Sequence, residues 1–496
     1  MPQLHQNLRK SIEPYIMFKI RTERKKTMSH CNTKMISEHN LKSQKDYIEE
    51  LRKRIQGKNF TYHITTYGCQ MNVHDSEKLA GMLHEIGYTQ TQNQQEADLV
   101  LFNTCCVREN AELRVYGNVG ALKSYKQVNP NCIIGICGCM MQQAEVADYI
   151  TKTFPFVDLV FGTHNVHRLP QLLFQALNSN HTVVEIVDSE GTVTEYVPIH
   201  RTKGVSAWVT IIYGCNNYCS YCIVPYVRGK ERSRQPKDIL DEIQVIADEG
   251  YKEITLLGQN VNSYGKDLDQ EYLFHHLLQD VNKIKGIERI RFMTSHPKDL
   301  SDELIKTIAE CNKVSKHLHL PIQAGSNRIL HEMNRKYTRE YYIELVEKIR
   351  SHIPDISITT DIIVGFPGET EEDFKDTLEL VKMVRFDSAY SFMYSPRKGT
   401  PAAKKKDQVP LEEKKERLSR LNELLNRICY EENMKYFNKV VEVLVEGSSK
   451  SRKDILTGRT DTNKPVNFKG ELDLVGNLVA LRITKIQSYS LFGEII

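Results

Sequence analysis

Long hydrophobic runs are absent from this chain of 496 residues. No apolar stretch approaches the roughly 18–20 residues of a membrane-spanning helix, which argues against an integral membrane protein. The N-terminus also lacks the basic-then-apolar arrangement of a secretory signal, because its longest apolar stretch, residues 15–18, is too short. Twelve cysteines without an export signal indicate metal or redox chemistry in a reducing compartment rather than disulfides. We therefore expect a cytoplasmic protein.

A fourth cysteine is missing from the densest cysteine cluster, in which Cys215, Cys219 and Cys222 are spaced as Cys-x₃-Cys-x₂-Cys. Structural zinc requires four ligands, and ordinary iron–sulfur clusters take four cysteines. Three thiolates on a four-iron cluster leave one iron open for a substrate. The motif resembles that of radical S-adenosylmethionine (SAM) enzymes, and Tyr221 before the last cysteine favours this interpretation over zinc or buried structural thiols.

The net charge of +4 conceals a division along the chain. Residues 1–58 carry 14 Lys and Arg against 6 Asp and Glu, residues 59–396 carry 33 against 43, and residues 397–496 carry 20 against 14. Basic terminal segments on an acidic central region are typical of a nucleic-acid-binding segment attached to a catalytic domain, although a solvated basic surface explains the charge equally well. We interpret residues 1–59 as a basic, mobile extension with one amphipathic helix at 46–55.

Residues 60–178 alternate strand-like and helical segments, which predicts a parallel sheet covered by helices. Strands are expected at residues 60–67, 97–103, 132–137 and 157–161. Cys69, Cys105 and Cys139 follow three of these strands at spacings of 36 and 34 residues, about one βα unit each. Because the carboxyl ends of parallel strands share one edge, the three cysteines should meet there as a second three-cysteine site. Cys106 and Cys137 are possible substitutes, but on extended segments they should point elsewhere, so we assign them to packing.

A second alternating series, within residues 201–431, has six expected strands. Six βα units are too few to close the eight-stranded barrel, so we expect a partial barrel that is open on one side. The Cys215–Cys222 segment follows the first of these strands, on the catalytic face of such a barrel. The expected strands are residues 206–213, 253–258, 288–294, 316–322, 357–364 and 387–394.

Residues 411–438 have helical periodicity, and the chain then changes to short strands at 440–445, 455–459, 478–483 and 490–496. Short strands with glycine-containing turns predict a small β-barrel over residues 434–496, and such barrels often bind oligonucleotides. The fold class is therefore α/β with a C-terminal all-β barrel.

Loop residues at the barrel's strand ends give weaker signals. Gly365 and Gly368 would let the backbone approach a ligand closely, although a strand-to-helix turn explains them equally well. Arg335, Lys336 and Arg397 are candidates for contacts with phosphates, with solvated surface as the alternative.

These motifs together resemble the methylthiotransferases, a radical-SAM family, from about residue 60 to the C-terminus. The shared segments are Tyr-Gly-Cys-Gln-Met-Asn (67–72), Asn-Thr-Cys (103–105), Gly-Cys-Met (138–140), the Cys-x₃-Cys-x₂-Cys, Leu-Leu-Gly-Gln-Asn-Val-Asn (256–262), Thr-Ser-His-Pro-Lys-Asp-Leu (294–300), Leu-His-Leu-Pro-Ile-Gln-Ala-Gly-Ser-Asn (318–327) and Tyr-Ser-Pro-Arg-Lys-Gly-Thr-Pro-Ala-Ala (394–403). The resemblance implies a cluster-binding N-terminal domain, a radical-SAM core and a C-terminal TRAM barrel.

The resemblance also implies the chemistry. The reaction would convert N6-(dimethylallyl)adenosine at position 37 of tRNA to its 2-methylthio derivative, using two SAM molecules. One 4Fe-4S cluster, on Cys215, Cys219 and Cys222, would reduce SAM to a 5′-deoxyadenosyl radical. An auxiliary 4Fe-4S cluster would carry the inserted sulfur on the residues Cys69, Cys105 and Cys139.

Further expectations concern ligands and partners. We expect Gln259, Ser295 and Gln323 to contact SAM, because each lies at a strand end, and no catalytic residue beyond the cluster ligands. Expected partners are the tRNA anticodon stem-loop, an electron-donor protein and a sulfur-donor system. The alternatives are a methylthiotransferase acting on threonylcarbamoyl-adenosine or on a ribosomal protein, and a non-enzymatic zinc- and RNA-binding protein.

Overall fold

The structure is a computed structural model, and it describes the chain except for residues 1–37, 107–108, 188–192, 203, 450–451 and 453. None of the helices in the described part is long and apolar enough to cross a membrane.

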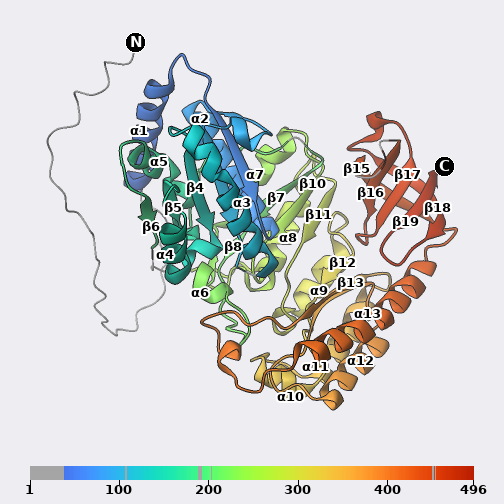
Figure 1. Ribbon diagram of the computed structural model, residues 1–496. Coiled ribbons are helices and arrows are strands. Elements are labelled where there is room, and N and C mark those ends of the chain that lie inside the picture. Colours follow the sequence, from blue (N-terminus) through green and yellow to red (C-terminus); the bar gives the residue numbers. More distant parts are fainter. Residues whose placement is uncertain (1–37, 107–108, 188–192, 203, 450–451, 453) are drawn as a thin grey trace, which may run out of the picture. The chain divides into compact units, whose positions relative to one another are not determined.

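The first βα series forms one parallel six-stranded sheet in the order β2-β1-β3-β4-β5-β6 (Figure 1). All four expected strands are confirmed, and two short edge strands extend the sheet. Every residue of β3 and β4 is buried, because helices cover both faces of the sheet. The strands are β1 (Thr61–Thr66), β2 (Thr89–Gln90), β3 (Leu99–Thr104), β4 (Ile133–Gly138), β5 (Leu159–Phe161) and β6 (Val183–Glu185).

Alternation along each strand divides the hydrophobic core of this sheet in two. Leu99 and Leu101 pack on the side of α2 (Gln70–Ile86) and α5 (Leu169–Leu177). Val100 and Phe102 point to the other side, where α3 (Glu109–Val128) and α4 (Ala144–Thr153) lie. Because successive side chains of a strand point to opposite faces, the same strand contributes residues to the hydrophobic core on each side of the sheet.

The chain before the first strand differs from the expectation. Helix α1 (Glu38–Ile55) is longer than the expected helix at 46–55, and it packs against α5 and α2. Its residues Ile48, Leu51 and Ile55 are buried in the core on that side of the sheet. A mobile extension through residue 59 is therefore wrong for this helix, because its apolar stripe has a partner. The expectation for residues 1–37 lies outside the described residues.

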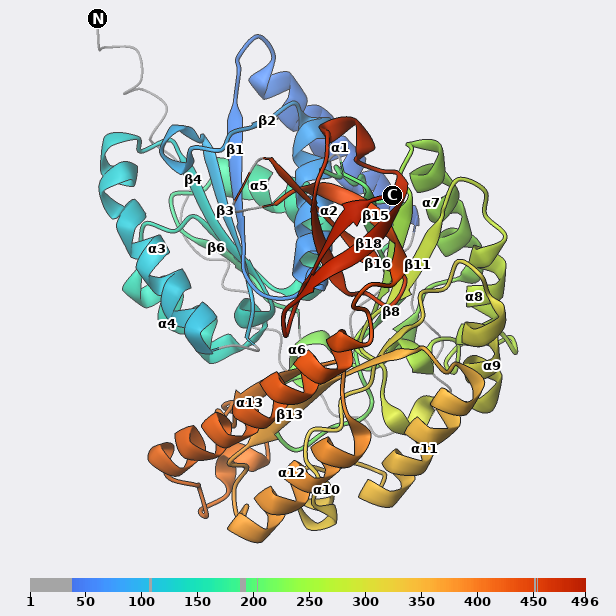
Figure 2. The same cartoon turned by 90° about the vertical axis from the view of Figure 1, so that its right-hand side faces the viewer.

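The second series forms the expected partial barrel. Two parallel three-stranded sheets, β7-β10-β11 and β12-β13-β14, are joined by a parallel bridge between Ile290 and Val314. The helices α7, α8, α9 and α11 lie along the outer side of the strands (Figure 2). The six strands are β7 (Ser206–Thr210), β10 (Glu253–Leu257), β11 (Arg289–Phe292), β12 (His317–His319), β13 (Ser357–Val364) and β14 (Ser388–Met393).

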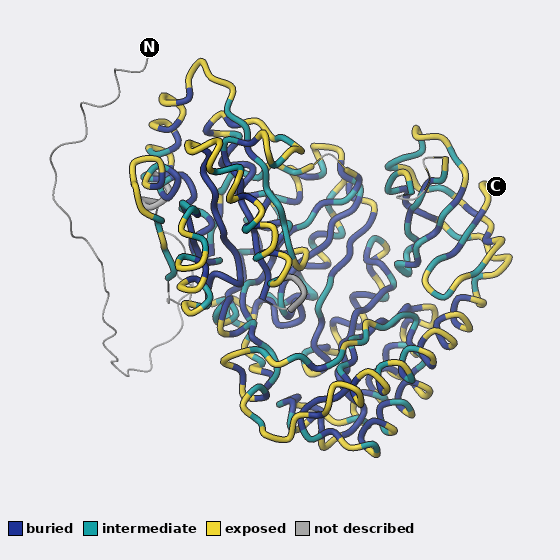
Figure 3. Tube along the Cα trace, viewed as in Figure 1, coloured by how far each residue is buried: buried dark blue, intermediate teal, exposed yellow. Residues whose placement is uncertain are grey.

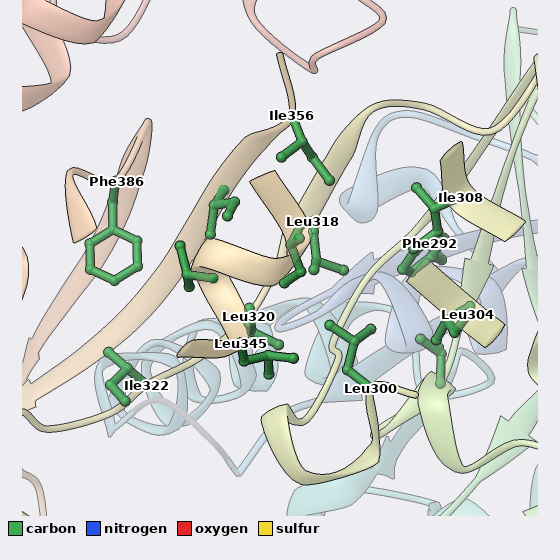
Figure 4. Close-up of a cluster of buried hydrophobic side chains, with 14 of the residues drawn as sticks. Phe292, Leu300, Leu304, Ile308, Leu318, Leu320, Ile322, Leu345, Ile356 and Phe386 are labelled. Atoms are coloured by element: carbon green, nitrogen blue, oxygen red, sulfur yellow. The ribbon is translucent and has the colours of Figure 1, made fainter. Parts of the chain in front are cut away.

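The helices of this series are α6 (Val224–Arg228), α7 (Pro236–Asp248), α8 (Phe274–Asn282), α9 (Asp302–Glu310), α10 (Asn327–Glu332), α11 (Arg339–His352) and α12 (Glu371–Val384), and β8 (Ile212–Tyr213) pairs with β9 (Arg232–Ser233). Their apolar faces and alternate strand residues make one core cluster. Figure 4 shows part of it, with Phe292 of β11 among Leu304 and Ile308 of α9. In Figure 3 the buried trace follows the strands, and the exposed trace follows the outer faces of helices.

The other face of these strands is polar and looks into the barrel. Ile358, Ile362 and Val364 of β13 join the core, whereas Thr359 and Asp361 alternate with them on the opposite face. On β11, Arg291 likewise turns inward and pairs with Glu253 of β10 at 2.7 Å. The barrel interior is therefore suited to polar ligands rather than to a packed hydrophobic centre.

Helix α13 (Leu411–Met434) holds the glycine-bearing turn after β13. Gly365 and Gly368 have φ values of 69° and 77°, which favour glycine. A Cβ on Gly365 would lie 2.3 Å from Cγ of Lys414, so the close approach is to the chain itself. Arg417 of α13 donates to the Glu369 carboxylate at 2.9 Å, and both side chains are 1% exposed.

The C-terminal segment is a closed five-stranded barrel in the order β15-β16-β17-β19-β18. Four of its strands match the expected ones, and β17 was not expected from the sequence. It starts at Pro465, which lacks an N–H for the sheet ladder and follows a turn-like Asn-Lys pair. The strands are β15 (Val440–Ser448), β16 (Ile455–Thr460), β17 (Pro465–Lys469), β18 (Leu478–Ile486) and β19 (Leu491–Ile495).

The Arg417–Glu369 pair generates a stability prediction. Arg417→Met leaves a buried carboxylate without its guanidinium, which should lower the free energy of unfolding by about 3–5 kcal/mol. Chemical denaturation measures the change. Arg420→Met is the matched control on the same helix. Its pair with Glu371 is 37% and 38% exposed, so a loss of about 1 kcal/mol or less is expected. Equal losses in the two variants would contradict this account.

Candidate metal centres

Three neighbouring strands of the N-terminal sheet bring Cys69, Cys105 and Cys139 together. Cys69 caps the N-terminus of α2 directly after β1, Cys105 follows β3, and Cys139 opens a 3₁₀ turn (Cys139–Gln142) after β4. Because β1, β3 and β4 are adjacent and parallel, their carboxyl ends share one edge. The expected convergence of the three cysteines is therefore present.

Asn72 and Gly68 define the geometry of this first trio. The thiols of Cys69 and Cys139 both donate to Oδ1 of Asn72 at 3.7 Å. Gly68 has a φ of 109°, and a Cβ there would lie 2.7 Å from Sγ of Cys105. Only a residue without a side chain lets Cys105 pack this closely beside the Cys69 backbone.

A buried guanidinium reaches this trio from the second βα series. Arg228 ends helix α6, and its Nε donates to Sγ of Cys139 at 3.2 Å. Its Nη2 donates to Asn72 Oδ1 and to Asp75 Oδ2, both at 2.9 Å. Asp75 therefore balances the charge of Arg228. Nothing in the sequence marked Arg228, because its partners lie about 90 and 150 residues away.

Cys106 is closer to the trio than its sequence position indicated. It is buried in the core as expected, but it also hydrogen-bonds to the thiol of Cys139. That bond is the largest influence lowering the pKa of Cys139 to about 6, and Arg228 adds to it against the opposing effect of burial. Cys137 packs in the core on the other side of the sheet, and burial raises its pKa.

The second trio, Cys215, Cys219 and Cys222, lies in the loop between β8 and α6. The loop is fixed by backbone bonds from Cys215 N to Gly229 O at 3.1 Å and from Cys222 N to Cys219 O at 2.9 Å. Burial raises the pKa of Cys215 to about 11 and that of Cys222 to about 12. Thiols with raised pKa values can still bind a metal as thiolates, because metal binding releases their protons.

A second buried guanidinium contacts this trio. Nη1 of Arg335 donates to Sγ of Cys219 at 3.4 Å, and its other nitrogens donate to Tyr337 OH at 2.7 Å and Pro321 O at 2.8 Å. Among the described residues no carboxylate pairs with it. Arg335 is 8% exposed, so the interpretation as a solvated or phosphate-facing residue is wrong for it, whereas Lys336 is exposed and Arg397 half-buried.

These features fit anionic iron–sulfur clusters. Within the described part of the chain, no three His, Cys, Asp or Glu side chains are arranged to hold a single metal ion. A four-iron cluster is wider than one ion and tolerates thiols that stand further apart. A buried cation without a carboxylate, such as Arg335, is costly unless an anion lies beside it, and a thiolate-bound cluster provides one. The cysteines of the described part form no disulfides.

The three expected SAM contacts lie at the carboxyl ends of consecutive barrel strands. Gln259 follows β10 and donates through Nε2 to Sδ of Met71, while its buried Oε1 has no partner among the described residues. Ser295 follows β11, and its buried Oγ also has no partner there. Gln323 follows β12 with a φ of 74°. Buried polar atoms without partners fit a polar ligand at this edge.

Family models match three parts of the chain. The radical SAM superfamily matches residues 209–381, the uncharacterized protein family UPF0004 matches residues 61–162, and the TRAM domain matches residues 435–496. The three matches cover, in order, most of the partial barrel (all but β14 and the start of β7), the strands of the first trio and the C-terminal barrel.

Among solved structures, the chain is similar to the radical S-adenosylmethionine methyltransferase TsrM from Kitasatospora setae. The identity is 13% and the TM-score 0.51, over 70% of this chain and 77% of that one. At this identity the similarity concerns the fold alone.

Curated relatives are much more similar in sequence. A tRNA-2-methylthio-N(6)-dimethylallyladenosine synthase from Acetivibrio thermocellus is 58% identical over 93% of this chain and 97% of the relative. Synthases of the same name from Thermoanaerobacter pseudethanolicus and Clostridium perfringens are 57% and 58% identical, over 93% and 87% of this chain and 98% and 97% of the relatives. The chain therefore belongs to the tRNA-2-methylthio-N(6)-dimethylallyladenosine synthase family of radical SAM enzymes.

Proposed function

We propose that this protein is a cytoplasmic radical-SAM methylthiotransferase that converts N6-(dimethylallyl)adenosine at position 37 of tRNA to 2-methylthio-N6-(dimethylallyl)adenosine. The observation that carries the proposal is the 58% identity to a named synthase of this type over nearly its full length. The meeting of Cys69, Cys105 and Cys139 at one sheet edge supports it, since this reaction needs a second cluster beside the radical-generating one.

In this proposal Cys215, Cys219 and Cys222 hold the 4Fe-4S cluster that binds SAM, and the other trio holds the auxiliary 4Fe-4S cluster. Bound clusters supply the electron for SAM cleavage and the sulfur to be inserted. Gln259, Ser295 and Gln323 orient SAM at the barrel edge, where Gln259 and Ser295 each have a buried polar atom without a partner among the described residues. Three cysteines rather than four at each site would leave one position of a bound cluster free for a substrate.

Two contacts between the N-terminal sheet and the partial barrel support the view that the two cysteine trios act on the same substrate. Arg228 stands six residues after Cys222 in the chain and donates to Cys139 at 3.2 Å. Gln259 reaches Met71, two residues after Cys69. Two residues of the second series, Arg228 and Gln259, therefore reach the segment that carries the first trio, an arrangement suited to passing one substrate base between two groups.

In this proposal each of the three expected domains has its own role in the reaction. Residues 60–178 hold the auxiliary cluster, residues 201–431 form the radical-SAM core, and residues 434–496 form the TRAM barrel that grips the anticodon stem-loop. Recognition of RNA through an unpaired, splayed-out base suits this task. An electron-donor protein supplies the reducing equivalents, and a sulfur-donor system rebuilds the auxiliary cluster.

Nucleoside analysis of tRNA tests the substrate. A deletion strain should lose 2-methylthio-N6-(dimethylallyl)adenosine and accumulate the unmethylthiolated nucleoside, and mass spectrometry of digested tRNA measures both. The amount of methylthiolated threonylcarbamoyl-adenosine in the tRNA should stay unchanged. Loss of that nucleoside in place of the dimethylallyl one would transfer the assignment to the sister activity.

Iron content tests the two ligand sets. Cys69→Ala and Cys215→Ala should each lose about half of the roughly eight irons of the anaerobically purified protein, since each substitution removes a ligand from one cluster. Cys429→Ala is the control, because Cys429 is buried on α13 without a metal-like context. Full iron in both ligand variants, or an equal loss in the control, would refute the ligand assignment.

The two arginines predict a difference in reduction potential. A buried cation stabilises the more negative, reduced form of a cluster. Arg335→Leu should therefore lower the midpoint potential of the cluster on Cys219 by about 60 mV or more, equivalent to about 1.4 kcal/mol for one electron. Arg228→Leu should have a smaller effect on the auxiliary cluster, because Asp75 offsets the arginine charge. Redox titration followed by electron paramagnetic resonance measures both, and equal shifts would contradict the argument.

A further inference from the structure

A cavity of about 560 Å³ lies inside the partial barrel, between strands β13 and β14 and the C-terminal barrel. Its lining includes Thr359 and Tyr390 from the strands and Asn463 and Tyr489 from the C-terminal segment. This volume falls within the range of small-ligand pockets, about 300–1,000 Å³. None of the six expected cluster cysteines and none of the three expected SAM contacts lines it.

Three exposed aromatic side chains line this cavity. Tyr390 and Phe392 are 56% and 41% exposed, and they stand two residues apart on β14, the edge strand of the sheet. Strand register places them opposite Asp361 and Ile363, on the inward face. Tyr489, in the β18–β19 turn, is 54% exposed, and its hydroxyl donates to Asn426 of α13. Aromatic rings left open to solvent from two separate segments indicate a partner with flat apolar faces.

A buried acceptor without a partner lies in the same lining. Asn433, at the end of α13, is 1% exposed. Its Nδ2 donates to Gln487 O at 2.8 Å and to Ser488 O at 3.0 Å, so the orientation of the amide is fixed. Its Oδ1 has no hydrogen-bond partner among the described residues. A buried acceptor of this kind favours a ligand that brings an N–H donor.

The walls of the cavity are held together by contacts between the C-terminal barrel and the amino ends of the core strands. Lys464 forms an ion pair with Asp387 at 2.9 Å, with both side chains nearly buried. Arg289 donates to Arg459 O at 2.7 Å, and Arg291 donates to Thr460 O at 3.1 Å. The walls that carry the aromatic rings and Asn433 are therefore fixed relative to one another around one cavity.

Flat apolar rings beside a fixed amide acceptor match an unpaired nucleobase. Aromatic side chains stack on either face of a base, and exocyclic amino groups donate to amide oxygens. The reacting adenine belongs elsewhere, at the carboxyl edge beside the cysteine loops. Thr359 of the cavity precedes Val364 at that edge by five residues, about 16 Å along the strand.

We propose that this cavity is a stacking subsite for an unpaired loop nucleotide of the substrate RNA other than the modified adenosine, with Tyr390, Phe392 and Tyr489 as the stacking rings and Asn433 as the acceptor. The subsite rests on the proposed function, since it requires a structured RNA with an unpaired loop as substrate. It holds the loop so that the neighbouring adenosine reaches the cluster edge.

Binding of a synthetic anticodon stem-loop RNA that carries N6-(dimethylallyl)adenosine tests the subsite. Tyr390→Ala and Phe392→Ala should each raise the dissociation constant about tenfold, within the range of losses seen when a stacking ring is removed. Tyr390→Phe keeps the ring and should bind like the wild type. Replacing each unmodified loop base in turn with 2-aminopurine should show one position whose fluorescence is quenched by the wild type and not by Tyr390→Ala.

Two controls separate the possible outcomes. Tyr430→Ala removes an aromatic ring of similar exposure, 45%, from α13 outside the cavity, and it should leave RNA binding unchanged. A duplex RNA without a loop should bind the wild type and Tyr390→Ala equally. If the wild type binds the stem-loop and all variants match it, the subsite is overturned while the proposed function stands. If the wild type does not discriminate the stem-loop from the duplex, the proposed function itself fails.

Discussion

Parallel strand direction is the constraint on which both cysteine sites depend. Each strand of the N-terminal sheet and of the partial barrel ends on the same edge as its neighbours, so residues about one βα unit apart meet in space. Cys69, Cys105 and Cys139 come together in this way without any local motif. The loop that contains Cys215 follows the first strand of the barrel, at the edge formed by the carboxyl ends of its strands. One geometric rule thus positions both cysteine trios in separate parts of the sequence.

Buried guanidinium groups complete the two centres and distinguish them. Arg228 touches Cys139 and is balanced by Asp75, whereas Arg335 touches Cys219 and has no carboxylate partner among the described residues. Burying a cation is costly unless a nearby anion repays the lost hydration. Each arginine therefore contributes charge to its cysteine trio. The two trios differ in electrostatic environment, because a carboxylate offsets only Arg228.

The C-terminal barrel is part of the core's walls rather than a separate attached unit. Its β16–β17 region contacts the amino ends of the core strands, and Lys464 pairs with Asp387 there. These contacts lie at the end of the strands opposite the cysteine loops. The barrel interior is thereby bounded by the cysteine-bearing loop at one end and by the C-terminal barrel at the other, with a polar and aromatic lining between them.

The sequence by itself determined the α/β class, the main strands of the two βα series and the Cys-x₃-Cys-x₂-Cys loop, because alternating hydrophobicity and close cysteine spacing are local signals. It also predicted that Cys69, Cys105 and Cys139 would meet, since each follows a strand of one parallel sheet. It misjudged α1, whose apolar stripe has meaning only beside α5. It could not identify Arg228 or Asn433 as site residues, and it gave Arg335 the wrong role, because their partners are distant in sequence. Tertiary structure alone decided which charges are buried, which acceptors lack partners and which aromatic rings face a cavity, since burial and pairing depend on segments that only folding brings together.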